Sequence, residues 1–238
     1  STSGTVSQSN SSVNANILLD AGYNISLVTL NQNATNAVTF SVAAGDTIVK
    51  DSLGANSIFT NQKVTTIGIL ANPTYYGYQY QTYGAWGAWG NAGIGGNAVS
   101  VGNITSAGNI PTTGSATFTG GANGYLIDGL KNSYVTSASM SATVDFAARQ
   151  VAFSTTGTTI VGKTSGTATA ISGLNLTGNM SYVAGANTMT GSVTSASGMS
   201  GSMIGNFYGP AANEIGGTYG LTQTTTGNSL VGGFGGKR

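Results

Sequence analysis

The sequence has no cysteine and no histidine, and these absences exclude several kinds of chemistry. Disulfides, cysteine-based zinc sites and the Ser–His or Cys–His pairs of many hydrolases cannot be assembled. Charge is also scarce, because only 7 basic and 6 acidic residues occur among 238, for a net charge of +1. The longest basic run is Lys237 and Arg238, so we predict no binding to nucleic acid, which needs clustered cations. No apolar run approaches the ~20 residues of a membrane-spanning helix, so no membrane span is predicted.

The few acidic residues do not form a pattern for catalysis or for binding a metal. Asp128 follows Ile127 in a turn-like segment, and Asp145 lies on the polar face of an expected strand, so both are interpreted as surface groups. Glu214 is the only glutamate, and we interpret it as an acceptor of backbone hydrogen bonds at a corner of the chain. Calcium loops need several closely spaced carboxylates. The sequence therefore predicts no catalytic residue, no metal site and no cofactor, and the protein is not expected to be an enzyme.

The composition indicates an extracellular or bacterial cell-surface protein. Charged residues make up 5% of the chain, against about a quarter in ordinary soluble domains, so Ser, Thr, Asn and Gln provide most of the polar surface. A chain rich in these residues, poor in Lys and Glu and free of cysteine fits an extracellular location. No signal peptide is visible, and Ser1 is expected to be the N-terminus left after processing.

Glycines and alternating apolar residues predict an all-β fold. The sequence has 38 glycines against 3 prolines, which favours sheets with many tight turns. Apolar residues alternate with polar ones in several segments, most clearly at Met140, Ala142, Val144 and Phe146. Such strands have one buried and one solvated face. Turn signals such as the Gly-Ala-Asn of residues 185–187 recur at short intervals and predict antiparallel hairpins in a barrel or a sandwich.

Composition also divides the chain into four parts. Residues 1–16 are mostly polar and predict an extended N-terminal arm, docked on its own domain or on a neighbour. We expect residues 17–102 to form a β-rich domain, residues 103–113 to be a linker, and residues 114–238 to form the barrel. An arm of this kind can add a strand to the sheet of a neighbouring copy. The candidate inserted residues are Val6, Val13, Ile17 and Leu19.

A specific motif occupies the last third of the sequence. Residues 205–219 read GNFYGPAANEIGGTY, and residues 232–238 read GGFGGKR. With GSATFTGG at 114–121 and YGAWG at 83–87, these segments closely resemble the barrel of the transferrin-binding protein B family, whose relatives include factor H-binding protein and the hemophilins. The resemblance implies a β-rich, handle-like N-terminal domain followed by a small antiparallel eight-stranded β-barrel. It also implies a secreted or cell-surface protein that binds a host protein or haem.

We interpret the motif as structural. Pro210 fixes its own backbone and cannot donate to a ladder, so it ends a strand and turns the chain. Glu214 can then accept backbone hydrogen bonds, and the glycines that follow let the next strand approach closely. Eight strands enclose a space that side chains fill, so a packed core is expected and not a pore. The predicted motif comprises Phe207, Tyr208, Gly209, Pro210, Glu214, Gly216, Gly217 and Phe234.

A second distinctive segment, residues 75–89, is rich in aromatic residues. Its rings fall mainly at even positions, which predicts a strand with one aromatic face. One interpretation is a half-buried strand that packs against the barrel or the N-terminal sheet. The alternative is a contact surface, or a haem pocket, since Tyr or Met can ligate iron. The hemophilins use histidine to bind haem, and the absence of histidine here weakens the haem interpretation. The candidate contact residues are Tyr76, Tyr78, Tyr80, Trp86 and Trp89.

Two functions follow from these observations. The first hypothesis is a self-assembling extracellular subunit of a fibre or coat, linked through its N-terminal arm, because low charge gives little repulsion between copies. The alternative is a ligand-capture protein that binds haem or a host iron or serum protein through barrel loops and the aromatic segment. We place the structural subunit first, with self-association as the expected partnership and a host protein or haem as the alternative partner.

Overall fold

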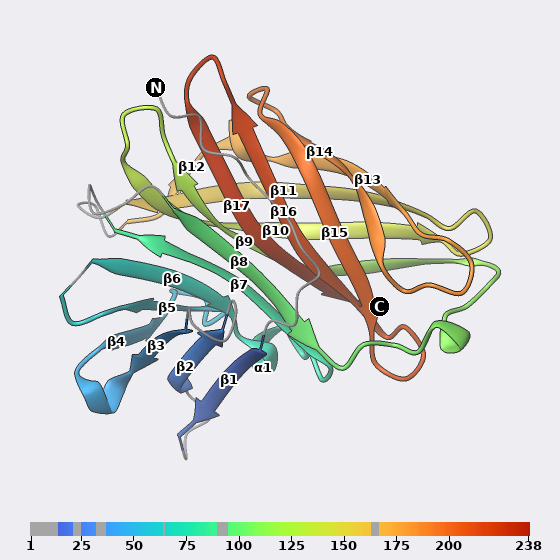
Figure 1. Ribbon diagram of the computed structural model, residues 1–238, viewed down its shortest axis with the longest axis horizontal. Coiled ribbons are helices and arrows are strands. Elements are labelled where there is room, and N and C mark those ends of the chain that lie inside the picture. Colours follow the sequence, from blue (N-terminus) through green and yellow to red (C-terminus); the bar gives the residue numbers. More distant parts are fainter. Residues whose placement is uncertain (1–13, 21–24, 32–36, 64, 90–94, 163–166) are drawn as a thin grey trace.

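The computed structural model describes residues 14–20, 25–31, 37–63, 65–89, 95–162 and 167–238. Nearly all regular structure in these residues is β, which confirms the all-β prediction. Three sheets follow one another along the chain, and the last of them closes into a barrel (Figure 1).

The barrel has eight antiparallel strands, as predicted. They are β9 (Ser115–Ile127), β10 (Ser133–Asp145), β11 (Gln150–Gly162), β13 (Leu176–Ser181), β14 (Met189–Ser195), β15 (Ser200–Tyr208), β16 (Glu214–Gln223) and β17 (Asn228–Lys237). Their order is β10-β9-β17-β16-β15-β14-β13-β11, and the pairing of β10 with β11 closes the ring. A short strand, β12 (Thr169–Ala170), pairs with β11 outside the ring.

Side chains fill the barrel, in agreement with its strand number. Phe118, Phe207 and Phe234 are completely buried, and the rings of Phe153 and Phe234 lie 4.9 Å apart between centroids. Methionines fill the remaining gaps, since their flexible side chains adapt to irregular space. The apolar residues that alternate along the sequence supply this core.

Two smaller sheets precede the barrel, and we call them together the handle. The five-stranded sheet has the order β4 (Thr47–Lys50), β5 (Asn56–Thr60), β6 (Thr66–Ala71), β7 (Gln81–Ala88) and β8 (Gly96–Gly102). The three-stranded sheet has the order β1 (Asn14–Leu19), β2 (Ile25–Asn31) and β3 (Ala37–Ser41).

The central strands β6 and β7 of the five-stranded sheet are buried on both faces. Leu70 and Trp86 point to one side and pack with residues of the three-stranded sheet. Ile69 and Ala85 point to the other side and pack with Tyr125 on the barrel wall. The molecule therefore has three layers: the small sheet, the five-stranded sheet and the barrel (Figure 1). Burial on both faces explains why β6 reads as an almost continuous apolar run.

Helices are few and short. α1 (Pro73–Tyr76) is a single turn of α-helix, and η1 (Val42–Ala44), η2 (Ala107–Asn109) and η3 (Ser172–Leu174) are 3₁₀ turns. The prediction of a strand through residues 75–80 is wrong, because α1 begins at the favourable N-terminal position of Pro73 and ends at Gly77, which adopts a left-handed conformation. Within the described part of the chain, none of these helices has the length and apolarity needed to cross a bilayer.

The segment expected to be a linker is held firmly against the barrel. Asn103 donates its N–H to Tyr80 O at 2.7 Å and accepts from Gly209 N at 2.8 Å. Thr105 donates its N–H to Phe207 O at 2.9 Å. The division of the chain into a separate N-terminal domain and a barrel domain stays a prediction, and the two parts share the extensive contact described next.

Candidate functional site

The first candidate site is the junction between the handle and the outer wall of the barrel. Strand β17 presents Gly233 and Gly235 outward there, and a Cβ on Gly235 would meet the ring of Tyr83 at 2.6 Å. Only glycine permits this close approach. The hydroxyl of Tyr78 donates to Gly235 O at 2.6 Å. The handle thus rests directly on the backbone of the barrel.

Glu214 and Gln81 connect the two parts at this junction. The Glu214 side chain, which is 3% exposed, accepts from Gln79 N at 2.7 Å and from Tyr80 N at 3.3 Å. Gln81 Nε2 donates to Ile215 O at 2.7 Å and to Gly236 O at 3.3 Å. Burial raises the pKa of Glu214, and the backbone hydrogen bonds together with the charge of Lys237 offset only part of that rise. Every polar contact named here is made within the chain, so the geometry fits a structural role.

The predicted motif residues are distributed between the core and this junction. Phe207 and Phe234 lie inside the barrel. Tyr208, which is also a residue of the predicted motif, shares a hydrogen bond of 3.0 Å with Ser100 of the handle. Gly216 lies against Gln81, since a Cβ there would meet the Gln81 side chain.

The turn that follows Tyr208 completes the motif. Gly209 has a φ of 86° and begins the turn that contains Pro210. Gly217 faces the barrel interior, where a Cβ would meet the ring of Phe234 at 2.8 Å. The structure therefore brings the motif together as the element that joins barrel and handle.

The aromatic segment is largely covered. Tyr78, Trp86 and Trp89 are buried, whereas Tyr76 and Tyr80 are half-buried. Trp86 packs under the three-stranded sheet, Trp89 packs against the barrel wall, and Tyr78 packs with Tyr83. These three side chains therefore do not form an exposed contact surface. This corrects the contact-surface interpretation for them.

The tyrosines of the segment pack mainly on one another. The rings of Tyr76 and Tyr78 stack with centroids 5.1 Å apart, and that of Tyr83 lies 6.0 Å from Tyr78. Burial raises the pKa of each of these three hydroxyls. The cluster therefore acts as a core between barrel and handle.

The predicted assembly arm is only partly described. Val6 and Val13 lie outside the described residues. Ile17 is half-buried in β1 and packs against the handle core of its own chain, and Leu19 pairs with Ile25 of β2. Ile17 and Leu19 therefore belong to a sheet of their own chain, in which β1 is an edge strand. Insertion of the arm into a neighbour stays a prediction.

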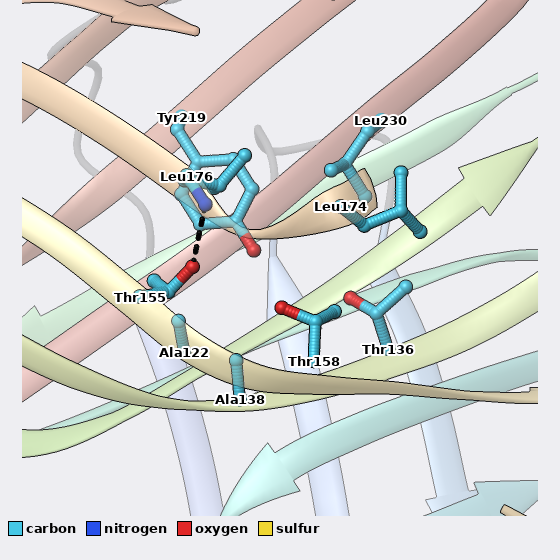
Figure 2. Close-up of a pocket in the computed structure, with 9 residues that line it drawn as sticks. All are labelled: Ala122, Thr136, Ala138, Thr155, Thr158, Leu174, Leu176, Tyr219 and Leu230. Atoms are coloured by element: carbon cyan, nitrogen blue, oxygen red, sulfur yellow. Dashed lines mark hydrogen bonds between the residues drawn. The ribbon is translucent and has the colours of Figure 1, made fainter. Parts of the chain in front are cut away.

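A small cavity lies within the barrel (Figure 2). Its volume is about 10 Å³, which is room for one water molecule. Leucines and alanines line it together with the hydroxyl-bearing residues Thr136, Thr155, Thr158 and Tyr219. Haem is far too large for this cavity.

The second candidate site is the barrel end that lies away from Glu214. Three turns meet there, at residues 128–132, 196–199 and 224–227, and we call them the distal turns (upper part of Figure 1). Leu130 at the tip of the first turn is 84% exposed. The turn at Asp128 is predicted from the sequence, but Leu130 is not among the predicted contact residues, although an apolar residue between Gly129 and Lys131 is a usable signal.

Hydrogen bonds fix the distal turns. Asp128 Oδ1 accepts from Leu130 N and Asn132 N, at 2.9 and 2.8 Å. Although partial burial acts to raise the pKa of Asp128, hydrogen bonds from Asn132, Tyr134 and Leu130 outweigh it and hold the pKa below its usual value.

Further hydrogen bonds tie the distal turns to one another. Gly129 N donates to Asn228 Oδ1 at 2.9 Å, and Gln223 Nε2 donates to Ser197 O at 3.0 Å. Leu130 is therefore presented on a preorganised surface, which reduces the entropy cost of binding.

These features define a class of protein, a filled eight-stranded β-barrel with a β-sheet handle docked on its outer wall. The family model of the C-lobe and N-lobe beta barrels of Tf-binding protein B matches residues 110–238. The chain belongs to this family of transferrin-binding protein B barrels, as the sequence motif implied.

Solved structures of transferrin-binding protein B share the fold. A Trp-176-Ala mutant of the protein from Haemophilus parasuis Hp5 has a TM-score of 0.55 and 15% sequence identity, over 88% of this chain and 47% of that chain. Intact Ap-TbpB, with its N and C lobes, has a TM-score of 0.54 and 13% identity, over 97% of this chain and 47% of that chain. The chain thus spans about half the length of these structures. No curated protein matches the sequence.

Proposed function

We propose that this protein is a non-enzymatic capture protein of the bacterial cell surface that binds a host protein through its distal turns. Proteins with this fold are named for binding transferrin, and transferrin or a related serum protein is the first partner to test. The observation that carries the proposal is Leu130, an 84% exposed apolar side chain on a turn held by hydrogen bonds.

The chemistry of the distal turns suits a protein partner. In protein interfaces a few side chains that are desolvated at the centre of the contact, inside a rim that excludes water, provide most of the binding energy. Around Leu130 the side chains are mainly amides and hydroxyls, with Asp128 and Lys131 as the nearby charges. With so little charge, affinity would depend on shape and apolar contact more than on electrostatic steering.

This proposal replaces self-assembly as the favoured function. Ile17 and Leu19, two of the residues assigned to the assembly arm, belong to a sheet of their own chain. The haem alternative has less support than host-protein capture, since the barrel cavity has room for one water.

A binding experiment tests the proposal. Immobilised protein is exposed to host transferrins and to fractionated serum, and affinity is measured for the wild type and for Leu130→Ala. Because truncation of an interface anchor costs more than ~1 kcal/mol, we expect an affinity loss of roughly fivefold or more. Val183→Ala is the matched control, since Val183 is 71% exposed but lies in the turn at the opposite barrel end. Equal effects of the two substitutions, or no saturable binding to any fraction, would contradict the proposal.

A further inference from the structure

The barrel core contains four hydroxyl groups that its apolar packing does not require. Thr136, Thr155, Thr158 and Tyr219 are all buried, and their oxygens face one another across the small cavity (Figure 2). They come from three strands, β10, β11 and β16. Burying polar groups is costly unless they are hydrogen-bonded, so the hydrogen-bond partners of these four hydroxyls have to be identified.

A β-bulge creates the arrangement. Ser137 of β10 faces Thr159 of β11, but Ser139 faces Thr156, so β11 has one extra residue between the two pairs. Gly157 takes up the bulge with a φ of 64°. Side chains of a regular strand alternate, so Thr155 and Thr158 would point to opposite faces. The extra residue brings both threonines to the inside of the barrel.

The hydrogen bonds around the cavity leave one donor and several acceptor positions unused. Thr155 Oγ1 accepts from Leu176 N at 2.7 Å, so its own proton remains to be donated. Thr158 Oγ1 donates to Asn175 Oδ1 at 2.8 Å, and Tyr219 donates to Asn123 O at 3.3 Å. The oxygens of Thr158 and Tyr219 keep lone pairs that can accept. The cavity thus offers one donor and at least two acceptors.

We propose that the cavity is a binding site for a single structural water molecule. The water accepts from Thr155 and donates to the acceptor oxygens around it, which gives it about three hydrogen bonds, the usual number for a buried water. A cavity volume of about 10 Å³ matches one water. In this arrangement the water joins β11 and β16 inside the barrel.

A high-resolution crystal structure of the full chain tests the proposal directly. We expect one well-ordered water peak in hydrogen-bonding distance of Thr155 Oγ1 and Thr158 Oγ1. A dry cavity, or one closed by rotation of the threonines, would overturn the proposal.

Substitutions of Thr155 give an independent test. Thr155→Val keeps the shape but removes the hydroxyl, and we expect loss of the water peak and a fall in Tm of about 2–4 °C. Thr155→Ser keeps the hydroxyl and should retain the water. Thr177→Val, on the exposed outer face of β13, is the control and should leave both the water and the Tm unchanged. A water peak that persists in Thr155→Val would show that the hydroxyl does not bind it.

Discussion

Glu214 and Gln79 are joined by a hydrogen bond of 2.7 Å although 135 positions separate them in the sequence. The donor belongs to the backbone between α1 and β7 of the handle, and the acceptor opens strand β16 of the barrel. One carboxylate thus holds together two parts of the molecule that are far apart in the chain.

Removing that carboxylate should weaken the junction. Glu214→Ala leaves the partly buried N–H groups of Gln79 and Tyr80 without their acceptor, and an unsatisfied donor costs about 1–3 kcal/mol when it is kept from water. We expect the free energy of unfolding, measured by urea denaturation, to fall by an amount in this range. Glu214→Gln should cost less, because its amide oxygen still accepts one of the two hydrogen bonds. Equal losses in the two variants would count against an acceptor role.

The raised pKa of Glu214 should make the free energy of unfolding decrease as the pH rises. Because burial lifts the folded-state pKa above the ordinary value of 4.5, folding favours the protonated form. The contribution of this group is fully present below the unfolded pKa and is lost as pH rises through the folded pKa. The stability of the wild type relative to Glu214→Gln should therefore decline from pH 4 toward neutral pH. A relative stability that rises with pH would contradict this assignment.

Asp128 should behave in the opposite way. Its pKa is lowered in the folded protein, so its contribution is present above the unfolded pKa and is lost as pH falls through the folded pKa. Asp128→Asn should therefore destabilise the protein at neutral pH and matter progressively less on acidification. Thermal unfolding at a series of pH values measures the difference. An effect that is constant across the acid range would show that the carboxylate charge is not involved.

The close contact at Gly235 gives a fourth prediction. In Gly235→Ala the new methyl group would lie 2.6 Å from the Tyr83 ring, and overpacking of this kind costs about 1–3 kcal/mol. Urea denaturation should show that loss. Gly108→Ala is the matched control, since its Cβ would meet nothing within 4 Å, and it should change stability by less than about 0.5 kcal/mol. Similar losses in both variants would mean that the contact is not the cause.

Much of the barrel could be predicted from the sequence, because antiparallel strands with one solvated face produce a regular alternation. Met140, Ala142 and Val144 show this pattern and do line the barrel. The alternate aromatic positions of the segment before β7 predict a strand, whereas the structure has the helical turn α1 there. Pro73 and Gly77 are the residues that indicate this helical turn, because proline favours the start of a helix and glycine its end.

The candidate sites were harder to predict, for physical reasons. Burial of Trp86 results from the three-stranded sheet that packs on its side of the five-stranded sheet, and no local pattern encodes contacts between distant segments. Leu130 is one exposed residue, and its presentation depends on hydrogen bonds that turns distant in sequence make to each other. The bulge at Gly157 is visible only in the register of β10 and β11.

The glycines of β17 have a mechanical consequence. At Gly233 the backbone of the barrel contacts the backbone of the handle at Gly84, with no side chain between them. This close contact restricts relative motion of the handle and the barrel. The handle and the barrel should therefore move as a single body, and a partner that touches both would meet surfaces at a fixed spacing.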